Sequence, residues 1–177
     1  MNDRALSVLP LWLYPTNIPE KNLSDKEKAL ANQLSVNRSK QYKHSRSHIR
    51  YALSQLWNIS PLKIPLEASP GKAPKLSKGW GYISISHCYD ALLIGWSAER
   101  IGVDIERSDR KFSAKQLVNR FYFSEEKQQL EQFSGHNFNR AVLRKWIDKE
   151  ASIKWQQGGI NKDLSEWKCV GQSNSAI

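Results

Sequence analysis

The stretch YISISHCYDALLIGWSAERIGVDIE, residues 82–106, determines most of the fold that the sequence predicts. Tyr82 to Ser86 alternates isoleucine with serine, Ala91 to Trp96 is a continuous apolar run, and Ile101 to Glu106 alternates again. Short runs of this kind, joined by short connections, are typical of strands that pair as hairpins. We therefore expect an antiparallel meander within this stretch.

Local signals on both sides of the meander predict helices. Ser24 and Glu27 have the spacing of a capping box, which predicts a helix that ends near Leu34. Apolar residues at helical spacing predict a longer helix from about Arg38 to Trp57. Further expected elements are a first strand within Val8 to Tyr14, a proline-rich loop from Ser60 to Pro74, a capping box at Ser113 and Gln116, a helix capped by Ser124, a helix from Val142 to Gln156 and a last strand from Trp167 to Val170.

The composition restricts the class of protein. A chain of 177 residues makes one domain or two small halves with a shared core. No apolar run approaches the roughly 18 residues that suggest a membrane span. Cys88 and Cys169 are too few for a disulfide framework or a metal cluster, so we expect reduced thiols in a cytoplasmic protein that has no membrane association.

The formal net charge of +10 predicts a surface that attracts polyanions, such as nucleic acid, a phosphorylated ligand or an acidic protein. Basic residues are frequent in the predicted helix from Arg38. Such a run is usually a solvated face, and it is equally compatible with phosphate binding or docking. Its members are Arg38, Lys40, Lys43, Arg46 and Arg50, together with His44 and His48.

Two carboxylates recur in the third predicted strand. Asp104 and Glu106 would share one face of an extended strand, with their roots about 7 Å apart. Their oxygens can then converge on a hard cation such as Mg²⁺. A solvent-facing side of a surface strand explains the same pattern, and the residues alone leave both interpretations open.

The helix from Val142 to Gln156 carries two charges where an apolar face is expected. On a helical wheel Glu150 and Lys154 fall in the middle of the apolar half, whereas Lys149 and Trp155 fall on the polar half. A surface ion pair between residues four apart is the common alternative. A charge that faces the protein interior is costly unless it is paired or metal-bound, so the pattern favours a functional role.

Two shorter motifs are compatible with phosphate binding. Ser86 and His87 end a predicted strand, where a hydroxyl and an imidazole can bind phosphate or transfer protons. A hydrogen-bonded turn histidine is the alternative. Lys72 lies in a loop with Gly71 and Pro74, and a loop lysine either meets a phosphate or faces water.

Together these motifs resemble the 4'-phosphopantetheinyl transferases. Residues 101–106 followed by residues 146–154 look like the signature pair of that family, and residues 84–87 look like its serine–histidine motif. The loop at Lys72 is similar to its glycine–lysine–proline loop. Residues 123–127 resemble its phenylalanine–serine–x–x–glutamate motif, with Lys127 in the place of the glutamate and Glu126 one position earlier. The resemblance covers about Arg38 to Lys154 and indicates the longer, pseudo-dimeric class that includes the surfactin synthetase activator.

The resemblance implies an α+β fold of two similar halves, each a small antiparallel sheet with packed helices, and an active site between them. Residues 1–97 would form the N-terminal half, on the side of the coenzyme A 3'-phosphate. Residues 98–177 would form the C-terminal half, with the metal-binding and catalytic signature. Only 23 residues follow Lys154, where the class usually carries further strands, so we expect a shortened second sheet.

The resemblance also implies a reaction: transfer of 4'-phosphopantetheine from coenzyme A to a serine of an acyl or peptidyl carrier protein, with release of 3',5'-ADP. Asp104, Glu106 and Glu150 would hold Mg²⁺. Glu150, or a water on the metal, would take the proton of the carrier serine, and Lys154 would stabilise the departing 3',5'-ADP.

The resemblance assigns coenzyme A binding to the other motifs. Lys72, Ser86, His87 and Arg38 would bind its 3'-phosphate. The implied enzyme is a cytoplasmic monomer of the holo-[acyl-carrier-protein] synthase type, whose basic surface suits an acidic carrier protein. Two alternatives remain: another magnesium-dependent phosphoryl-transfer enzyme, and a nucleic-acid-binding protein that uses the basic helix.

Overall fold

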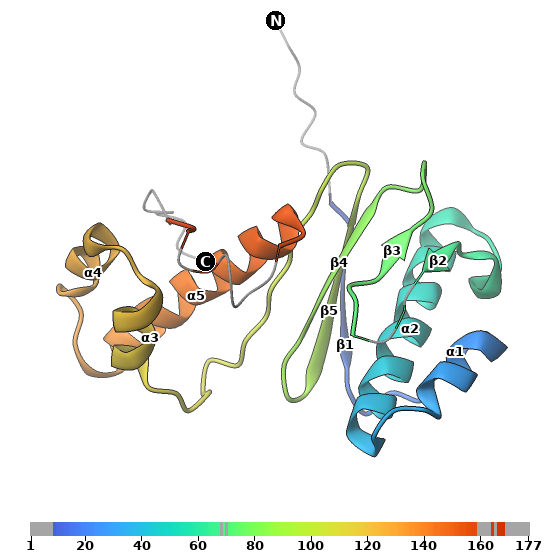
Figure 1. The fold of residues 1–177 in the computed structure, drawn as a ribbon, viewed down its shortest axis with the longest axis horizontal. Coiled ribbons are helices and arrows are strands. Elements are labelled where there is room, and N and C mark those ends of the chain that lie inside the picture. The colour runs from blue at the N-terminus through green and yellow to red at the C-terminus, as the bar shows by residue number, and fades with distance from the viewer. Residues whose placement is uncertain (1–8, 68, 70, 159–163, 165, 169–177) are drawn as a thin grey trace, which may run out of the picture. The chain divides into compact units, whose positions relative to one another are not determined.

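The computed structural model describes residues 9–67, 69, 71–158, 164 and 166–168. The chain has an α+β fold and divides into two compact units, Met1–Ile105 and Glu106–Ile177 (Figure 1). In the described residues, no helix is long and apolar enough to cross a membrane.

In its described residues, the first unit contains a three-stranded antiparallel sheet, a small two-stranded hairpin, two α-helices and a short 3₁₀ helix. The sheet has the order β1-β5-β4, so β5 is the central strand, and β1 pairs with the edge of β5 opposite to β4. The elements in chain order are β1 Leu11–Pro15, α1 Asp25–Ala31, α2 Val36–Trp57, a short 3₁₀ helix Pro61–Lys63, β2 Leu66–Glu67, β3 Lys75–Leu76, β4 Tyr82–His87 and β5 Ala91–Ser97. Strands β2 and β3 pair with each other in a separate small hairpin.

Helix α2 covers one face of the sheet, and the core of the first unit lies between them (Figure 1). Ile49 and Leu53 of α2 are fully buried against Leu92 and Ile94 of β5. The isoleucines of β4 also pack into this core, whereas its serines point to the opposite face because successive strand residues alternate. The sheet therefore presents a second face that is lined by serine side chains on β4.

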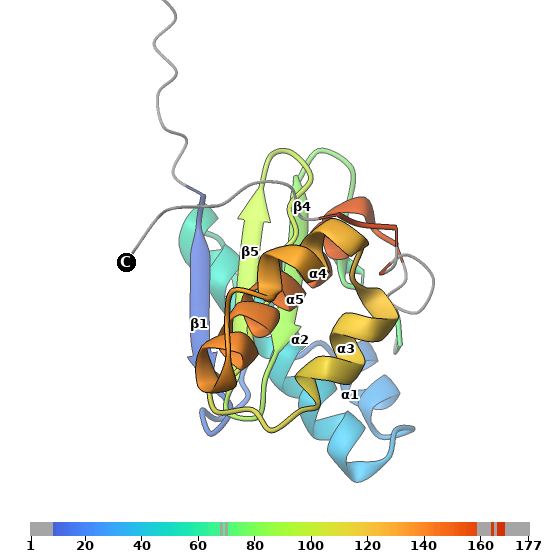
Figure 2. The same cartoon turned by 90° about the vertical axis from the view of Figure 1, so that its left-hand side faces the viewer.

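The predicted third strand from Ile101 to Glu106 is wrong. These residues pair with no strand, and both edges of β5 are already taken, by β4 as predicted and by β1 (Figure 2). The chain after β5 instead lies against the serine-lined face. There the backbone N–H of Val103 donates a 3.1 Å hydrogen bond to the hydroxyl of Ser84 rather than to a neighbouring strand.

In the second unit, the described elements are helices: α3 Ala114–Phe121, α4 Ser124–Leu130 and α5 Gly135–Gln156. Val118, Tyr122, Leu130 and Val142 form one buried cluster. The last turns of α5 pack in a second cluster that includes Leu164. The sheet that the resemblance implies for the C-terminal half stays a prediction. Of the predicted last strand, residues 167 and 168 form no strand, and residues 169 and 170 lie outside the described residues.

The predicted helices are confirmed, although some of their ends differ. The capping box of Ser24 and Glu27 is present at the start of α1. Ser113 precedes α3, but its side chain makes no capping hydrogen bond, so the second predicted box is wrong. Ser124 is the first helical residue of α4 rather than its cap. Helix α5 begins at Gly135, well before the predicted start at Val142.

Candidate active site

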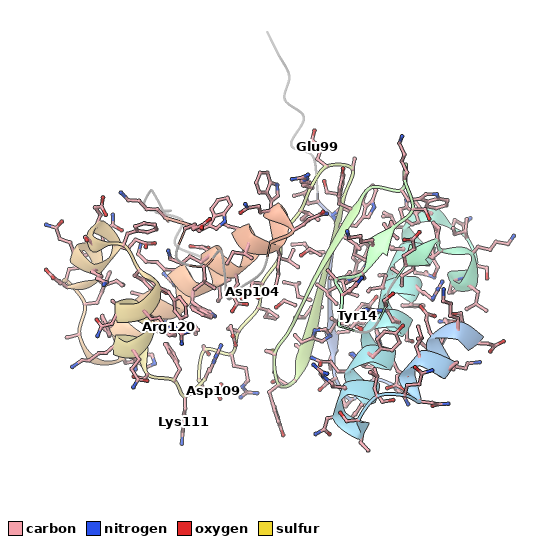
Figure 3. The ribbon with its side chains drawn as sticks, viewed as in Figure 1. Tyr14, Glu99, Asp104, Asp109, Lys111 and Arg120 are labelled. Atoms are coloured by element: carbon pink, nitrogen blue, oxygen red, sulfur yellow. The ribbon has the colours of Figure 1, made fainter. Side chains whose placement is uncertain are left out.

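In the first unit, Asp104 is held by a serine of the sheet. The hydroxyl of Ser86 on β4 donates a 2.6 Å hydrogen bond to Oδ1 of Asp104. Figure 3 labels Asp104 on the segment that follows β5. The Ser86 side chain is buried, since the residue is only 5% exposed. The structure therefore brings together two of the predicted site residues that lie 18 positions apart in the sequence.

A glycine on β5 allows this segment to approach the sheet. Gly95 pairs with Ser84 across the sheet and is buried. A Cβ atom at this position would lie 2.7 Å from Cγ1 of Val103 and 3.0 Å from Cδ1 of Ile101. Because real Cβ atoms essentially never approach closer than 3.0 Å, a larger residue at position 95 would require the Val103 side chain to shift.

The residues predicted to bind coenzyme A lie on three elements of the first unit. His87 is the last residue of β4, directly after Ser86, and is half-buried. Lys72 lies in the loop between β2 and β3, and Arg38 lies in the first turn of α2; both are exposed. Their predicted joint contact with a phosphate remains a prediction.

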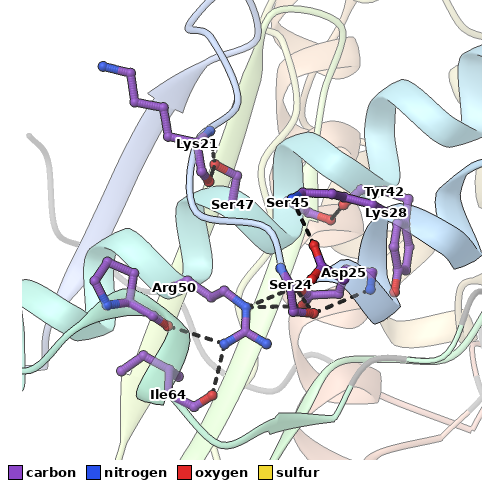
Figure 4. A network of polar contacts seen from close by, with 11 residues as sticks. Lys21, Ser24, Asp25, Lys28, Tyr42, Ser45, Ser47, Arg50 and Ile64 are labelled. Atoms are coloured by element: carbon purple, nitrogen blue, oxygen red, sulfur yellow. Dashed lines mark hydrogen bonds and ion pairs between the residues drawn. The ribbon is translucent and has the colours of Figure 1, made fainter.

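The basic helix is only partly the exposed face that was predicted: Arg38 and Lys40 are exposed, whereas several other cationic and imidazole side chains of the helix are buried. Arg50 forms an ion pair with Glu27 at 2.9 Å and also donates to the carbonyl oxygens of Pro61 and Ile64 (Figure 4). Arg46 lies over the ring of Tyr42, 4.7 Å from its centroid. The partners of Arg50 lie outside α2, so the periodicity of the helix alone did not reveal them, whereas Tyr42 lies one turn from Arg46 on the same helix.

His44 and His48 are also buried on this helix. The imidazole of His44 contacts the carbonyl oxygen of Pro15 at 3.1 Å, and its ring centroid lies 4.1 Å from that of His48. Burial, followed by the neighbouring His48, lowers the pKa of His44 from its ordinary value of 6.5. These histidines therefore connect α2 to the end of β1, where His44 contacts Pro15 and His48 packs against Tyr14.

In the second unit, Glu106 forms an ion pair with Arg110. The Glu106 side chain is 16% exposed and that of Arg110 is 39% exposed, so both remain partly accessible to solvent. Glu150 and Lys154 lie one turn apart on α5 and are both half-buried. This geometry places the carboxylate and the ammonium on the same side of the helix.

Sequence reasoning missed a buried ion pair next to Glu150. Lys149 of α5 is fully buried and lies 2.9 Å from Glu126 of α4, whose side chain is 1% exposed. The Lys149 ammonium also donates to the carbonyl oxygen of Trp167 and lies 5.2 Å from the ring centroids of Tyr122 and Phe123. The helical wheel placed Lys149 on the polar half, which is wrong because α5 is enclosed on more than one side.

The carboxylates of Asp104, Glu106 and Glu150 offer the oxygen ligands that a hard cation prefers. Carboxylate oxygens are preferred ligands of Mg²⁺, and a ligating carboxylate commonly accepts a hydrogen bond from an outer partner, as Asp104 does from Ser86. Within the described residues, no three His, Cys, Asp or Glu side chains form a metal-binding group. Asp104 belongs to the first unit, and Glu106 and Glu150 belong to the second, so their joint ligation of one ion remains a prediction.

Comparison with known families identifies the region that carries these carboxylates. Residues 100–177 match the family model of the 4'-phosphopantetheinyl transferase superfamily, ACPS. The matched region begins just after β5 and includes Asp104, Glu106, Glu150 and Lys154. No curated protein matches the chain. The resemblance to 4'-phosphopantetheinyl transferases is thus confirmed for this region at the level of the superfamily.

Proposed function

We propose that this protein transfers 4'-phosphopantetheine from coenzyme A to a serine of an acyl or peptidyl carrier protein, with Mg²⁺ as the metal. The observation that carries the proposal is the match of residues 100–177 to the 4'-phosphopantetheinyl transferase superfamily. The longer, pseudo-dimeric class and the holo-[acyl-carrier-protein] synthase type are finer parts of the same proposal.

Asp104, Glu106 and Glu150 would hold the metal ion. When bound, Mg²⁺ would neutralise the coenzyme A pyrophosphate and polarise the phosphorus that is attacked. To bind the metal ion, the Glu106 carboxylate would have to break its ion pair with Arg110 or contact both partners at once. Breaking the pair should cost little free energy, because ion pairs that solvent can reach contribute little to stability.

The reaction would form one bond and break one bond at phosphorus. The hydroxyl oxygen of the carrier serine attacks the phosphorus next to pantetheine, and 3',5'-ADP leaves with the electron pair of the broken P–O bond. Glu150 accepts the proton of the serine hydroxyl. Lys154, one turn further along α5, stabilises the negative charge that develops on the leaving group.

Binding of the two substrates would depend on the basic character of the chain. Lys72, His87 and Arg38 would bind the 3'-phosphate of coenzyme A, and Ser86 adjoins His87 at the end of β4. A net charge of +10 favours the approach of an acidic carrier protein. We place the reaction in the cytoplasm and expect the enzyme to act as a monomer.

Mass spectrometry of apo carrier proteins tests this proposal. Wild-type protein should add one phosphopantetheine to an acyl or peptidyl carrier, and the addition should require both coenzyme A and Mg²⁺. Glu150→Ala should slow the transfer by about 10²- to 10⁴-fold, the range for loss of a general base. Asp104→Ala should raise the Mg²⁺ concentration needed. Glu131→Ala, at an exposed position after α4, is the control and should transfer at the wild-type rate.

Two results would contradict the proposal at different levels. If no carrier gains mass with any combination of coenzyme A and Mg²⁺, the proposed reaction is wrong. If transfer occurs but neither Asp104→Ala nor Glu150→Ala slows it, the reaction stands and the assigned residues are wrong.

A further inference from the structure

The hydroxyl of Ser86 can serve only one acceptor at a time. A serine hydroxyl has a single proton to donate, and an ionised carboxylate only accepts. The 2.6 Å contact with Oδ1 of Asp104 therefore uses the Ser86 proton. A phosphate that is fully ionised also only accepts, so Ser86 cannot donate to a coenzyme A phosphate while it donates to Asp104.

Two neighbouring residues hold the backbone that carries Asp104. Ser84, two positions before Ser86 and on the same face of β4, accepts the hydrogen bond from the N–H of Val103. Gly95 lies opposite Ser84 in the sheet register and leaves the space that Ile101 and Val103 occupy. Ser84 and Ser86 are 6% and 5% exposed, so water competes little for either hydrogen bond.

We infer that Ser84, Ser86 and Gly95 form a seat that fixes the position of the Asp104 carboxylate, and that Ser86 acts through Asp104 rather than by holding the coenzyme A 3'-phosphate. This inference rests on the proposed function, in which Asp104 is a ligand of Mg²⁺. Ser84, Ser86 and Gly95 are accordingly positioning residues, and Asp104 is the residue that would touch the metal.

The demands of Mg²⁺ explain why such a seat matters. Mg²⁺ requires near-ideal octahedral geometry, so the orientation of a ligating carboxylate matters for its binding. Loss of a hydrogen-bond partner behind a metal ligand typically costs about 10- to 100-fold in metal affinity. Removal of the Ser86 hydroxyl should therefore be visible in metal binding itself, before any substrate is present.

Metal binding is measured on the full chain with Mn²⁺ as the probe, by electron paramagnetic resonance. Ser86→Ala should weaken Mn²⁺ binding by about 10- to 100-fold. Ser86→Thr keeps the hydroxyl and suits a strand, so it should bind nearly as wild type does. Ser54→Ala is the matched control, because Ser54 is a buried serine of the same unit whose hydroxyl donates to the Tyr51 carbonyl oxygen.

The transfer assay then distinguishes the two possible roles of Ser86. With coenzyme A and with 3'-dephospho-coenzyme A as alternative donors, Ser86→Ala should raise the Mg²⁺ requirement to the same extent. If the hydroxyl holds the 3'-phosphate, the variant slows only the reaction of coenzyme A and binds Mn²⁺ as wild type does. That pattern would overturn the inference.

Failure of the proposed function would be separable from failure of the inference. If wild-type protein modifies no carrier, the proposed function is wrong. The Mn²⁺ titration then still tests whether the Ser86 hydroxyl positions the Asp104 carboxylate. Weaker binding in Ser86→Ala supports it, whereas equal binding, or no binding by wild type, overturns it. If Ser86→Ala does not fold, as judged by thermal unfolding, Ser86→Cys replaces it, because a thiol of similar size is only a weak donor.

Discussion

The buried ion pair between Lys149 and Glu126 predicts a large loss of stability when only one partner is removed. Lys149→Met keeps the length of the side chain and removes its charge. The Glu126 carboxylate would then remain in the interior of the second unit, where its side chain is 1% exposed. Glu126 also accepts a 2.8 Å hydrogen bond from the N–H of Phe123, so it cannot turn to solvent without opening the start of α4.

The size of the effect follows from this burial. Breaking a buried pair by removing one charge costs about 3–5 kcal/mol, because the other charge stays uncompensated. Domains of this size have about 5–15 kcal/mol of stability in total. With a urea dependence of about 2 kcal/mol per molar, the midpoint of urea unfolding should fall by about 1.5–2.5 M.

Urea unfolding followed by circular dichroism measures this loss. The double variant Glu126→Gln/Lys149→Met should recover much of the stability, because two neutral side chains leave no buried charge. Glu125→Gln is the matched control, since the neighbouring Glu125 pairs with Lys168 at the exposed surface and its loss should change the midpoint little. A Lys149→Met midpoint close to that of wild type, or a double variant no more stable than Lys149→Met, would refute the reasoning.

Two further predictions concern the first unit. Gly95→Ala places a Cβ atom 2.7 Å from Cγ1 of Val103, and we expect thermal unfolding to show a loss of about 1–3 kcal/mol from overpacking, with weaker Mn²⁺ binding. For His44, the lowered pKa means that the folded state favours the neutral imidazole. Stability should therefore be highest above the ordinary pKa of 6.5 and should fall as the pH drops below it. Urea midpoints at a series of pH values check this, and His44→Gln should flatten the dependence.

The sequence predicted those elements whose signals are local. The capping box of Ser24 and Glu27 identified α1, and the alternation in residues 82–86 identified β4, because both patterns depend on neighbours in the chain. The start of α5 was missed by several residues because its first turns, which begin at Gly135, carry few apolar side chains. Local patterns thus located the elements better than they located their ends.

Features that depend on distant partners could not be predicted in this way. The alternation from Ile101 to Glu106 has the pattern of a strand, but whether a strand forms depends on a free edge, and β5 had already paired on both sides. The burial of Arg50 depends on Glu27, which lies 23 residues earlier in the chain. The burial of Lys149 depends on Glu126 of another helix. For both charged residues the sequence pattern was compatible with solvent exposure, and a partner distant in sequence buries the side chain.

The serines of β4 show how the same pattern acquires a functional meaning. Alternating isoleucine and serine predicts a strand with one buried face and one solvated face, in which the serines would be replaceable by most polar residues. Both serines are instead buried, and each bonds to the segment that carries Asp104. Both contacts are made by a hydroxyl carried directly on Cβ, a group that serine and threonine supply. The small hydroxyl side chains are therefore required for the position of the carboxylate, which links the pattern in residues 82–86 to the acidic motif that follows it.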